Sequence, residues 1–342
     1  MEPEAVPAAL AALGWSDRAL ALFNDLAQPG DEPARIVRVE RGHAVVVGRD
    51  GADRLVPAGG PVAVGDWVVL DGSAIRALLP RWSELSRKDP GVERAQVLAA
   101  NADLVVVAAP ADRLSTARVE REVAMGWQSG GTPVVVLTKY DLAAPDTLAG
   151  LEERLVGVDI LATSVVTGTG VGELAARLRP DRTAVLLGPS GAGKSALANA
   201  LLGTEQLRIG AVRAGDRRGR HTTTSRQLVP VPGGGVLIDT PGLRSLGLAG
   251  GEGIGEAFPD VEELAAGCRF NDCRHATEPG CAVLAAVAGG DLDGARLASF
   301  RKLEREAAVE ARRQDPLLAR AELEVWKARM REGRARSRPR RR

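Results

Sequence analysis

The chain has 342 residues, of which 45% are hydrophobic and only 3% are aromatic. This length accommodates two or three domains with mostly aliphatic cores. The formal net charge of +1 excludes a uniformly basic or acidic protein. No apolar run reaches the roughly 18 residues of a membrane-spanning helix, and the N-terminus lacks the pattern of a secretory leader. We therefore expect a cytoplasmic protein with no membrane partner.

The charge is unevenly distributed along the chain. Residues 327–342 contain nine Lys or Arg residues and one acid, Glu332. Such a basic tail is typical of segments that bind nucleic acid, and a solvated arginine-rich end is the alternative. Only five of the 45 basic residues are lysines. The presence of Lys139 and Lys194 inside two motifs typical of nucleotide-binding loops is therefore informative.

The N-terminal part predicts a short extension followed by a small β domain. Residues 1–30 form the expected extension, with one helix around 10–26. About five short alternating strands then follow between residues 34 and 79, separated by tight turns such as Asp50-Gly51. Such a run of antiparallel strands indicates a closed barrel. An oligonucleotide-binding (OB) barrel over 31–90 is the favoured fold, and an SH3-like barrel is the alternative.

From about residue 99 apolar runs alternate with helical segments. The runs lie at 103–110, 132–138, 159–164 and 183–188, and the helices are expected at 115–128, 151–157, 171–178 and 195–203. This alternation predicts a parallel sheet covered on both faces, with a hairpin at 226–240 beside it. We assign 95–250 to this α/β domain and 251–326 to a mainly helical domain, with a last helix after Pro316.

Residues 188–195 match the P-loop pattern G-x-x-x-x-G-K-S/T between an apolar strand and a helix. The glycines let backbone N–H groups point at phosphate oxygens beside a helix N-terminus, which favours anions. Lys194 is expected to reach the β- and γ-phosphates, and the Ser195 hydroxyl to bind Mg²⁺. The expected phosphate-binding residues are Gly188, Pro189, Ser190, Gly191, Ala192, Gly193, Lys194, Ser195 and Ala196.

Two later segments fit the switch regions of a nucleotide hydrolase. Asp239, at the end of the hairpin, is expected to hold Mg²⁺ through water, and the Gly242 N–H to sense the γ-phosphate. Between the P-loop and Asp239 lies 217–225, a polar segment with three threonines. Either Thr223 or Thr224 is expected to close on Mg²⁺, and the spacing does not separate them.

The segment from Thr138 to Asp141 reads T-K-Y-D and predicts guanine recognition. An aspartate carboxylate accepts hydrogen bonds from the guanine N1 and N2 groups, a donor pair that adenine lacks. Asp141 is expected to do so while the stem of Lys139 lies over the base. Tyr140 completes the loop, and a backbone N–H at Ser164, after the next strand, is expected to reach guanine O6.

All three cysteines and one of the three histidines lie within fourteen residues, with the spacing C-x4-C-x-H-x5-C. Three thiolates and an imidazole complete a tetrahedral zinc shell without an open position. An odd number of cysteines in an intracellular chain argues against disulfides. The pattern therefore predicts one structural Zn²⁺ held by Cys268, Cys273, His275 and Cys281.

The order of these motifs is unusual, because T-K-Y-D precedes the P-loop, the threonine segment and D-T-P-G. An ordinary small GTPase has the last three first. With the barrel and the cysteine–histidine site, this order resembles the circularly permuted, small-subunit-dependent GTPases of bacterial ribosomes over nearly the whole chain. The resemblance implies an OB barrel, a permuted P-loop GTPase domain and a zinc-binding domain. It also implies GTP hydrolysis with Mg²⁺, stimulated by the 30S subunit during late assembly, and contacts with 16S rRNA.

The chain departs from that family's usual pattern at two positions. Thr138 stands where the guanine motif more often has Asn, and Ala196 where a second hydroxyl residue is common. The residue after D-T-P-G is Leu243, which cannot orient the attacking water as a glutamine would. Its place in the threonine segment and the resemblance make His221 the catalytic candidate beside Lys194; a phosphate or RNA contact is its alternative role.

Three other functions fit the sequence less well. The T-K-Y-D motif disfavours a P-loop ATPase or kinase. Intact Lys194, Ser195 and Asp239 disfavour a non-enzymatic RNA-binding module. The cysteine–histidine site and the barrel disfavour a permuted GTPase of the large subunit. We expect a monomer.

Overall fold

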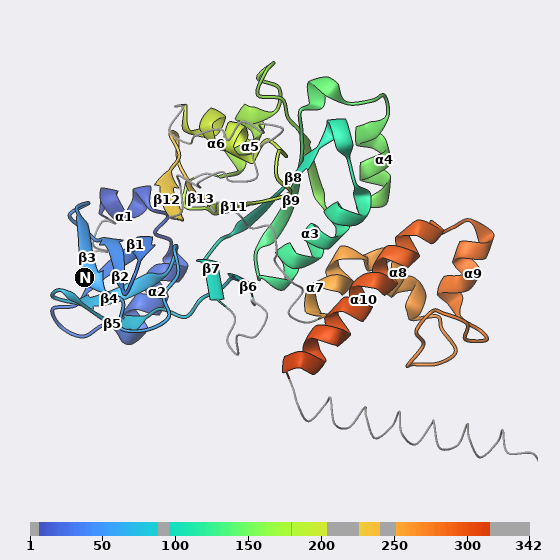
Figure 1. Ribbon diagram of the computed structural model, residues 1–342. Coiled ribbons are helices and arrows are strands. Elements are labelled where there is room, and N and C mark those ends of the chain that lie inside the picture. The colour runs from blue at the N-terminus through green and yellow to red at the C-terminus, as the bar shows by residue number, and fades with distance from the viewer. Residues whose placement is uncertain (1–6, 88–95, 179, 204–225, 240–250, 315–342) are drawn as a thin grey trace, which may run out of the picture.

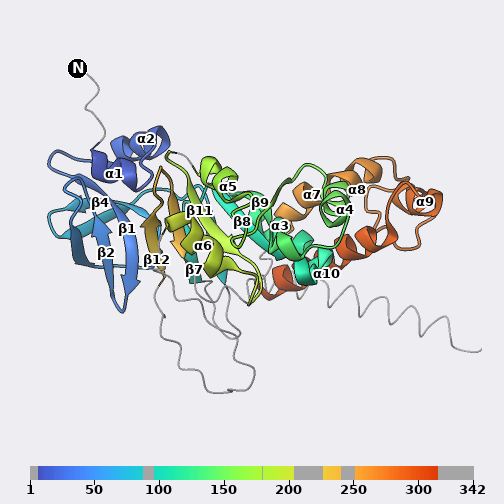
Figure 2. The same cartoon turned by 90° about the horizontal axis from the view of Figure 1, so that it is seen from above.

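The computed structural model describes residues 7–87, 96–178, 180–203, 226–239 and 251–314. Three parts lie in a row (Figures 1 and 2). Short antiparallel strands form one end, a larger sheet forms the centre and a group of helices forms the other end. None of the helices in these ranges combines the length and the apolar character that a membrane span requires.

The N-terminal extension forms two helices where the sequence predicted one. They are α1 (Ala8–Ala12) and α2 (Asp17–Leu26). Gly14 interrupts them with φ +80°, and the Ser16 side chain caps α2. The break lets Trp15 pack edge-on against Trp67 of the neighbouring strands, with ring centroids 4.8 Å apart. The extension is therefore part of the core of the N-terminal region.

The five short strands expected between residues 34 and 79 are confirmed. They are β1 (Glu32–Glu40), β2 (His43–Val47), β3 (Asp53–Pro57), β4 (Trp67–Asp71) and β5 (Ala74–Leu78). All of their pairings are antiparallel, in the order β5-β4-β1-β2-β3, and β3 also contacts β5. Alternate residues fill the interior between them: Ala34, Ile36, Ala44, Val46, Val56, Val68 and Leu70.

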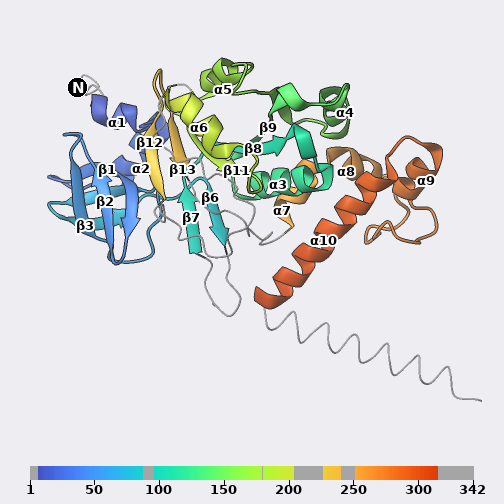
Figure 3. The same cartoon turned by 45° about the horizontal axis from the view of Figure 1, so that its top comes forward.

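The central sheet confirms the predicted alternation of strands and helices. Its strands are β8 (Leu104–Pro110), β9 (Thr132–Thr138), β10 (Asp159–Ala162), β11 (Thr183–Leu187), β12 (Gln227–Pro230) and β13 (Val236–Asp239). The order is β10-β9-β8-β11-β13-β12, in which only β12 is antiparallel to its neighbour within this sheet. The P-loop strand β11 thus lies inside the sheet, although three of these strands precede it in the chain. β12 also pairs antiparallel with β1, with Arg38 opposite Gln227, and so joins this sheet to the N-terminal strands. Figure 3 shows β12 beside those strands.

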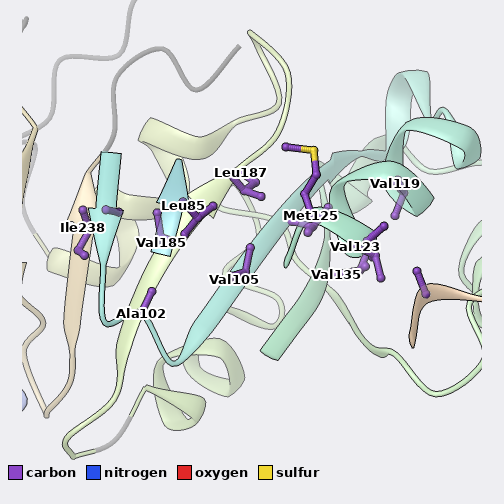
Figure 4. Close-up of a cluster of buried hydrophobic side chains, with 14 of the residues drawn as sticks. Leu85, Ala102, Val105, Val119, Val123, Met125, Val135, Val185, Leu187 and Ile238 are labelled. Atoms are coloured by element: carbon purple, nitrogen blue, oxygen red, sulfur yellow. The ribbon is translucent and has the colours of Figure 1, made fainter. Parts of the chain in front are cut away.

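Helices cover both faces of the central sheet, as its continuous apolar strands require. They are α3 (Thr116–Gln128), α4 (Thr147–Arg154), α5 (Val171–Arg177) and α6 (Lys194–Leu202). On one face Val105 and Val135 pack with Val119 and Val123 of α3 (Figure 4). The alternate residues of the same strands face α5 and α6 on the other side.

A two-stranded sheet that the sequence pattern did not predict connects the two β regions. Its strands are β6 (Glu84–Arg87) and β7 (Gln96–Ala100). Leu85 and Leu98 are buried in the same core as Ile238 of β13. Strands this short are difficult to recognise by periodicity, because the pattern repeats only twice.

The C-terminal part is helical, as predicted. Its helices are α7 (Glu252–Ala257), α8 (Pro259–Ala265), α9 (Ala282–Gly289) and α10 (Gly294–Gln314). Leu297, Phe300 and Leu303 form the buried face of α10 that their spacing predicts. The helix expected after Pro316 lies outside the described residues.

A buried ion network attaches these helices to the central sheet. Glu120 of α3 is fully buried and accepts hydrogen bonds from Arg154 (2.8 Å) and Arg296 of α10 (3.2 Å). Arg296 also donates twice to Asp260 of α8, at 2.6 Å each, and lies over the Phe258 ring. The contact between the two regions therefore depends on paired charges as well as apolar packing.

Candidate nucleotide and metal sites

The motifs predicted to bind nucleotide meet at one edge of the central sheet. β8, β9, β10, β11 and β13 are parallel, so their carboxyl ends lie on the same side. The T-K-Y-D loop follows β9, the Ser164 loop follows β10 and the P-loop follows β11, while Asp239 is the last residue of β13. In open α/β sheets this edge is the usual place for a ligand.

The P-loop has the backbone that its glycines predict. Gly188 and Gly193 adopt φ values of +134° and +88°, and α6 begins at Lys194. A Cβ atom at Gly188 would lie 2.6 Å from the Ala108 carbonyl oxygen, so only glycine fits there. The Lys194 ammonium donates to the carbonyl oxygens of Gly188 (2.7 Å) and Pro189 (2.9 Å). Its charge therefore lies against the loop that would surround the phosphates.

Thr138 connects the T-K-Y-D loop, called the guanine loop below, to the P-loop. Its hydroxyl donates to the carbonyl oxygen of Ala192 at 2.6 Å, and both residues are buried. The two loops are 54 residues apart in the chain. The threonine that stands in place of the more usual asparagine is thus long enough to reach across.

The remaining guanine-loop residues are held by specific contacts. Lys139 has a left-handed backbone (φ +53°), and its ammonium pairs with Asp112 at 3.0 Å. The Asp141 carboxylate accepts a 2.6 Å hydrogen bond from the Ser164 hydroxyl. The Tyr140 N–H donates to the Thr163 carbonyl at 3.0 Å. The carboxylate expected to read guanine is therefore oriented by the loop that follows β10.

The backbone of the Ser164 loop differs from the expectation in one respect. The Ser164 N–H donates to the Thr169 carbonyl at 3.0 Å, and the Ser164 hydroxyl accepts from the N–H groups of Val166 and Thr167. Within the described residues, the Val165 N–H between them has no hydrogen-bond partner. The N–H donor available at this position belongs to Val165.

A cavity of about 280 Å³ adjoins the P-loop, between the end of β8 and α3. Its charged lining residues are Arg113, Arg118 and Glu122, and Ser190 of the P-loop lies beside them. Burial raises the pKa of Glu122 to about 7, although Arg118, Lys194 and Arg121 oppose the shift. Sequence reasoning missed these residues because they belong to no motif; their only signal is that they follow a strand whose end lies at this edge.

Several predicted site residues lie outside the described ranges or at their margin. His221, Thr223, Thr224 and Gly242 are outside them. Ser195 is the second residue of α6, and its side chain is half-buried, beside the P-loop. The magnesium and catalytic assignments therefore stay predictions.

The structure brings the four predicted metal ligands together. Their ligand atoms all lie within 4.8 Å of one another. The Nδ1 atom of His275 is 3.6 Å from the Cys268 sulfur and 3.5 Å from the Cys281 sulfur, and these two sulfurs are 3.8 Å apart. A tetrahedron with Zn–S bonds of about 2.3 Å has edges of about 3.8 Å. The donor set and its spacing therefore fit a four-coordinate metal ion.

The loop that carries His275 is stabilised by hydrogen bonds between its own backbone and the side chain of Glu278. His275 has φ +52°, and the Glu278 carboxylate accepts from the N–H groups of Ala276 (2.7 Å), Thr277 (3.0 Å) and Arg274 (3.3 Å). These backbone donors, Ala276 foremost, lower the pKa of Glu278 to about 2. The ionised carboxylate thus accepts from backbone N–H groups on both sides of His275 and closes the loop that carries this residue.

Comparison with known proteins identifies the family. A family model described as RsgA GTPase matches residues 78–249, half of the chain. The chain belongs to the RsgA GTPase family. A small ribosomal subunit biogenesis GTPase RsgA from Streptomyces coelicolor is 47% identical, over 87% of this chain and 86% of that protein. The RsgA of Opitutus terrae is 41% identical, over 93% and 95% of the two chains.

Solved structures show the same fold at lower identity. YjeQ from Thermotoga maritima superposes with a TM-score of 0.61 at 24% identity, over 81% of this chain and 99% of its own. YloQ, described as a circularly permuted GTPase, has a TM-score of 0.60 at 22% identity, over 83% and 97%. The family recognition from the motif order is thereby confirmed, as is the permuted GTPase fold.

Proposed function

We propose that this chain is a GTPase that binds the 30S ribosomal subunit, acts in its late assembly and hydrolyses GTP faster when bound to it. The observation that carries the nucleotide part is the junction of P-loop and guanine loop, where the Thr138 hydroxyl donates to the Ala192 carbonyl at 2.6 Å. The small-subunit part rests on the RsgA relatives, which are small ribosomal subunit biogenesis GTPases. Contacts with 16S rRNA and action as a monomer belong to the same proposal.

Within this site, each loop has a separate role. The backbone N–H groups of the P-loop and Lys194 would hold the phosphates. Asp141, oriented by Ser164, would accept from guanine N1 and N2, and Val165 in place of Ser164 would donate to O6. His221 keeps its proposed role in orienting the attacking water. Because ATP lacks the donor pair that Asp141 requires, the site favours GTP.

Two metal ions complete the proposal. Mg²⁺ would enter with GTP, bound by Ser195 and one of the switch threonines, with Asp239 acting through water. Zn²⁺ would be held by the cluster at residues 268–281, because three thiolates and an imidazole at tetrahedral spacing suit it better than Mg²⁺ or Ca²⁺. With four protein ligands the zinc would stabilise the helical domain and take no part in hydrolysis.

The N-terminal strands support an OB-type barrel. β1 pairs with β2 and β4, β2 with β3 and β4 with β5, and the two end strands β3 and β5 lie near each other, which supports a closed barrel. We propose the domain limits given by the sequence: an extension over 1–30, the barrel over 31–90, the GTPase domain over 95–250, the zinc domain over 251–326 and the basic tail from 327. The barrel, the zinc domain and the tail would contact rRNA, so binding should weaken with salt.

GTP turnover by the full-length chain, alone and with purified 30S or 50S subunits, tests the proposal. We expect stimulation by 30S only, abolition of turnover in Lys194→Ala, and normal turnover in the matched control Lys302→Ala, which removes an exposed lysine of α10. Stimulation by 50S alone would favour a large-subunit GTPase, and preference for ATP would favour an ATPase. Unchanged stimulated turnover in His221→Ala would remove that residue from the mechanism.

A further inference from the structure

The short turn that follows β8 touches both nucleotide-binding loops. It is the 3₁₀ segment η1 (Ala111–Arg113), immediately after Pro110 at the end of that strand. β8 lies between β9 and β11 in the sheet. The turn that follows it therefore lies between the guanine loop after β9 and the P-loop after β11.

Two adjacent side chains of η1 reach in the two directions. The Asp112 carboxylate pairs with the Lys139 ammonium at 3.0 Å. The Arg113 guanidinium donates to the Ser190 carbonyl at 3.1 Å, across 77 residues of sequence. A Cβ atom on Gly191 would lie 2.4 Å from an Arg113 nitrogen, so the guanidinium lies directly over the turn of the P-loop.

We infer that Asp112 and Arg113 are positioning residues of the nucleotide site. Together they fix the position of the guanine loop relative to the P-loop. This inference rests on the proposed GTP-binding function and extends it to residues that no motif contains. By donating to the Ser190 carbonyl, Arg113 fixes the orientation of that peptide group, so that neighbouring N–H groups point toward the phosphate site. It also adds a positive charge near the phosphate site.

The two contacts should contribute unequally to nucleotide binding. Both side chains of the Asp112–Lys139 pair are about one-third exposed, at 31% and 33%, and exposed ion pairs contribute little. Arg113 is exposed as well, but its charge-assisted hydrogen bond goes to P-loop backbone that must be ordered for binding. A lysine at position 113 would retain the charge but not the planar, multiply donating group. Arg113 should therefore matter more than Asp112, and lysine should replace it only in part.

Titration of the full-length chain with fluorescent GDP and GTP analogues tests this inference. We expect the Kd for both nucleotides to rise about five- to tenfold in Arg113→Met, about threefold in Arg113→Lys and about twofold in Asp112→Asn. In steady-state hydrolysis Arg113→Met should raise KM by a similar factor while kcat changes less than twofold, since a ground-state contact is lost. The melting temperature should change little, because the contact lies in an exposed loop and its loss affects local opening more than global unfolding.

Arg177→Met is the matched control. It removes an arginine from an ion pair with Asp159, which begins β10 at the opposite end of the sheet. It should bind both nucleotides as the wild type does. Wild-type affinity in Arg113→Met, or an equal loss in Arg177→Met, would overturn the inference while leaving the proposed function intact. A wild-type chain that bound no guanine nucleotide would overturn both.

Discussion

Replacement of Thr138 by valine tests the contact that joins the guanine loop to the P-loop. Valine has the same shape as threonine, so the change removes the hydroxyl and leaves the packing in place. The lost hydrogen bond contributes about 1 kcal/mol, and the Ala192 carbonyl, which is fully buried, loses its partner at a cost of about 1–3 kcal/mol. Because part of each cost overlaps, we expect a total near 2 kcal/mol.

This free energy should appear in nucleotide affinity. GDP binds a P-loop that is already in its phosphate-binding conformation, so destabilising that conformation weakens binding. A change of 2 kcal/mol corresponds to a Kd for GDP that is about 30-fold higher in Thr138→Val. Titration with a fluorescent GDP analogue measures it, and native-state hydrogen exchange of the P-loop amides should show a matching loss of protection.

Thr138→Ser is the control, because serine keeps the hydroxyl and loses only a methyl group. Its affinity should lie within about fivefold of the wild type. A Thr138→Val variant that binds GDP within twofold of the wild type would refute the reasoning. Equal losses in both variants would refute it too, because packing and not the hydrogen bond would then be responsible.

Three further predictions concern stability and metal binding. Arg296→Met should lower the free energy of unfolding by about 3 kcal/mol or more, since it leaves Glu120 buried without one of its two cations and Asp260 unpaired. Calorimetry beside Arg305→Met, an exposed arginine of α10, tests this, and equal melting temperatures would contradict it. Elemental analysis should find one zinc per wild-type chain and none in Cys273→Ser. The C-terminal helices of that variant should become sensitive to protease. A full zinc content in Cys273→Ser would exclude the assigned ligand set. Because burial raises the pKa of Glu122 to about 7, from an ordinary value near 4.5, the folded state binds more protons between these pH values. The free energy of unfolding should therefore fall by up to about 3 kcal/mol as pH rises from 4.5 to 7, and Glu122→Gln should flatten this part of the profile; a profile identical to that of the wild type would contradict the assignment.

The sequence predicted those features that are encoded locally. Apolar runs of about seven residues between helical segments led to the central sheet, because a parallel strand buried on both faces must be apolar throughout. The P-loop was recognisable because glycine, lysine and serine are each required at a fixed position in one short loop. The same holds for the cluster at 268–281, whose ligand spacing is itself the signal.

Other features depend on residues that meet only when distant strands are assembled. Thr138 reaches Ala192, Asp112 and Arg113 bridge two loops, and Glu120 faces Arg296 across 176 residues of sequence. None of these contacts has a local pattern, because each depends on which strands are neighbours and on where their ends lie. The sequence by itself therefore determined which chemical groups this protein has and in what order. Only the tertiary structure decided how they hold one another in place, since strand order brings together loops that the chain keeps far apart.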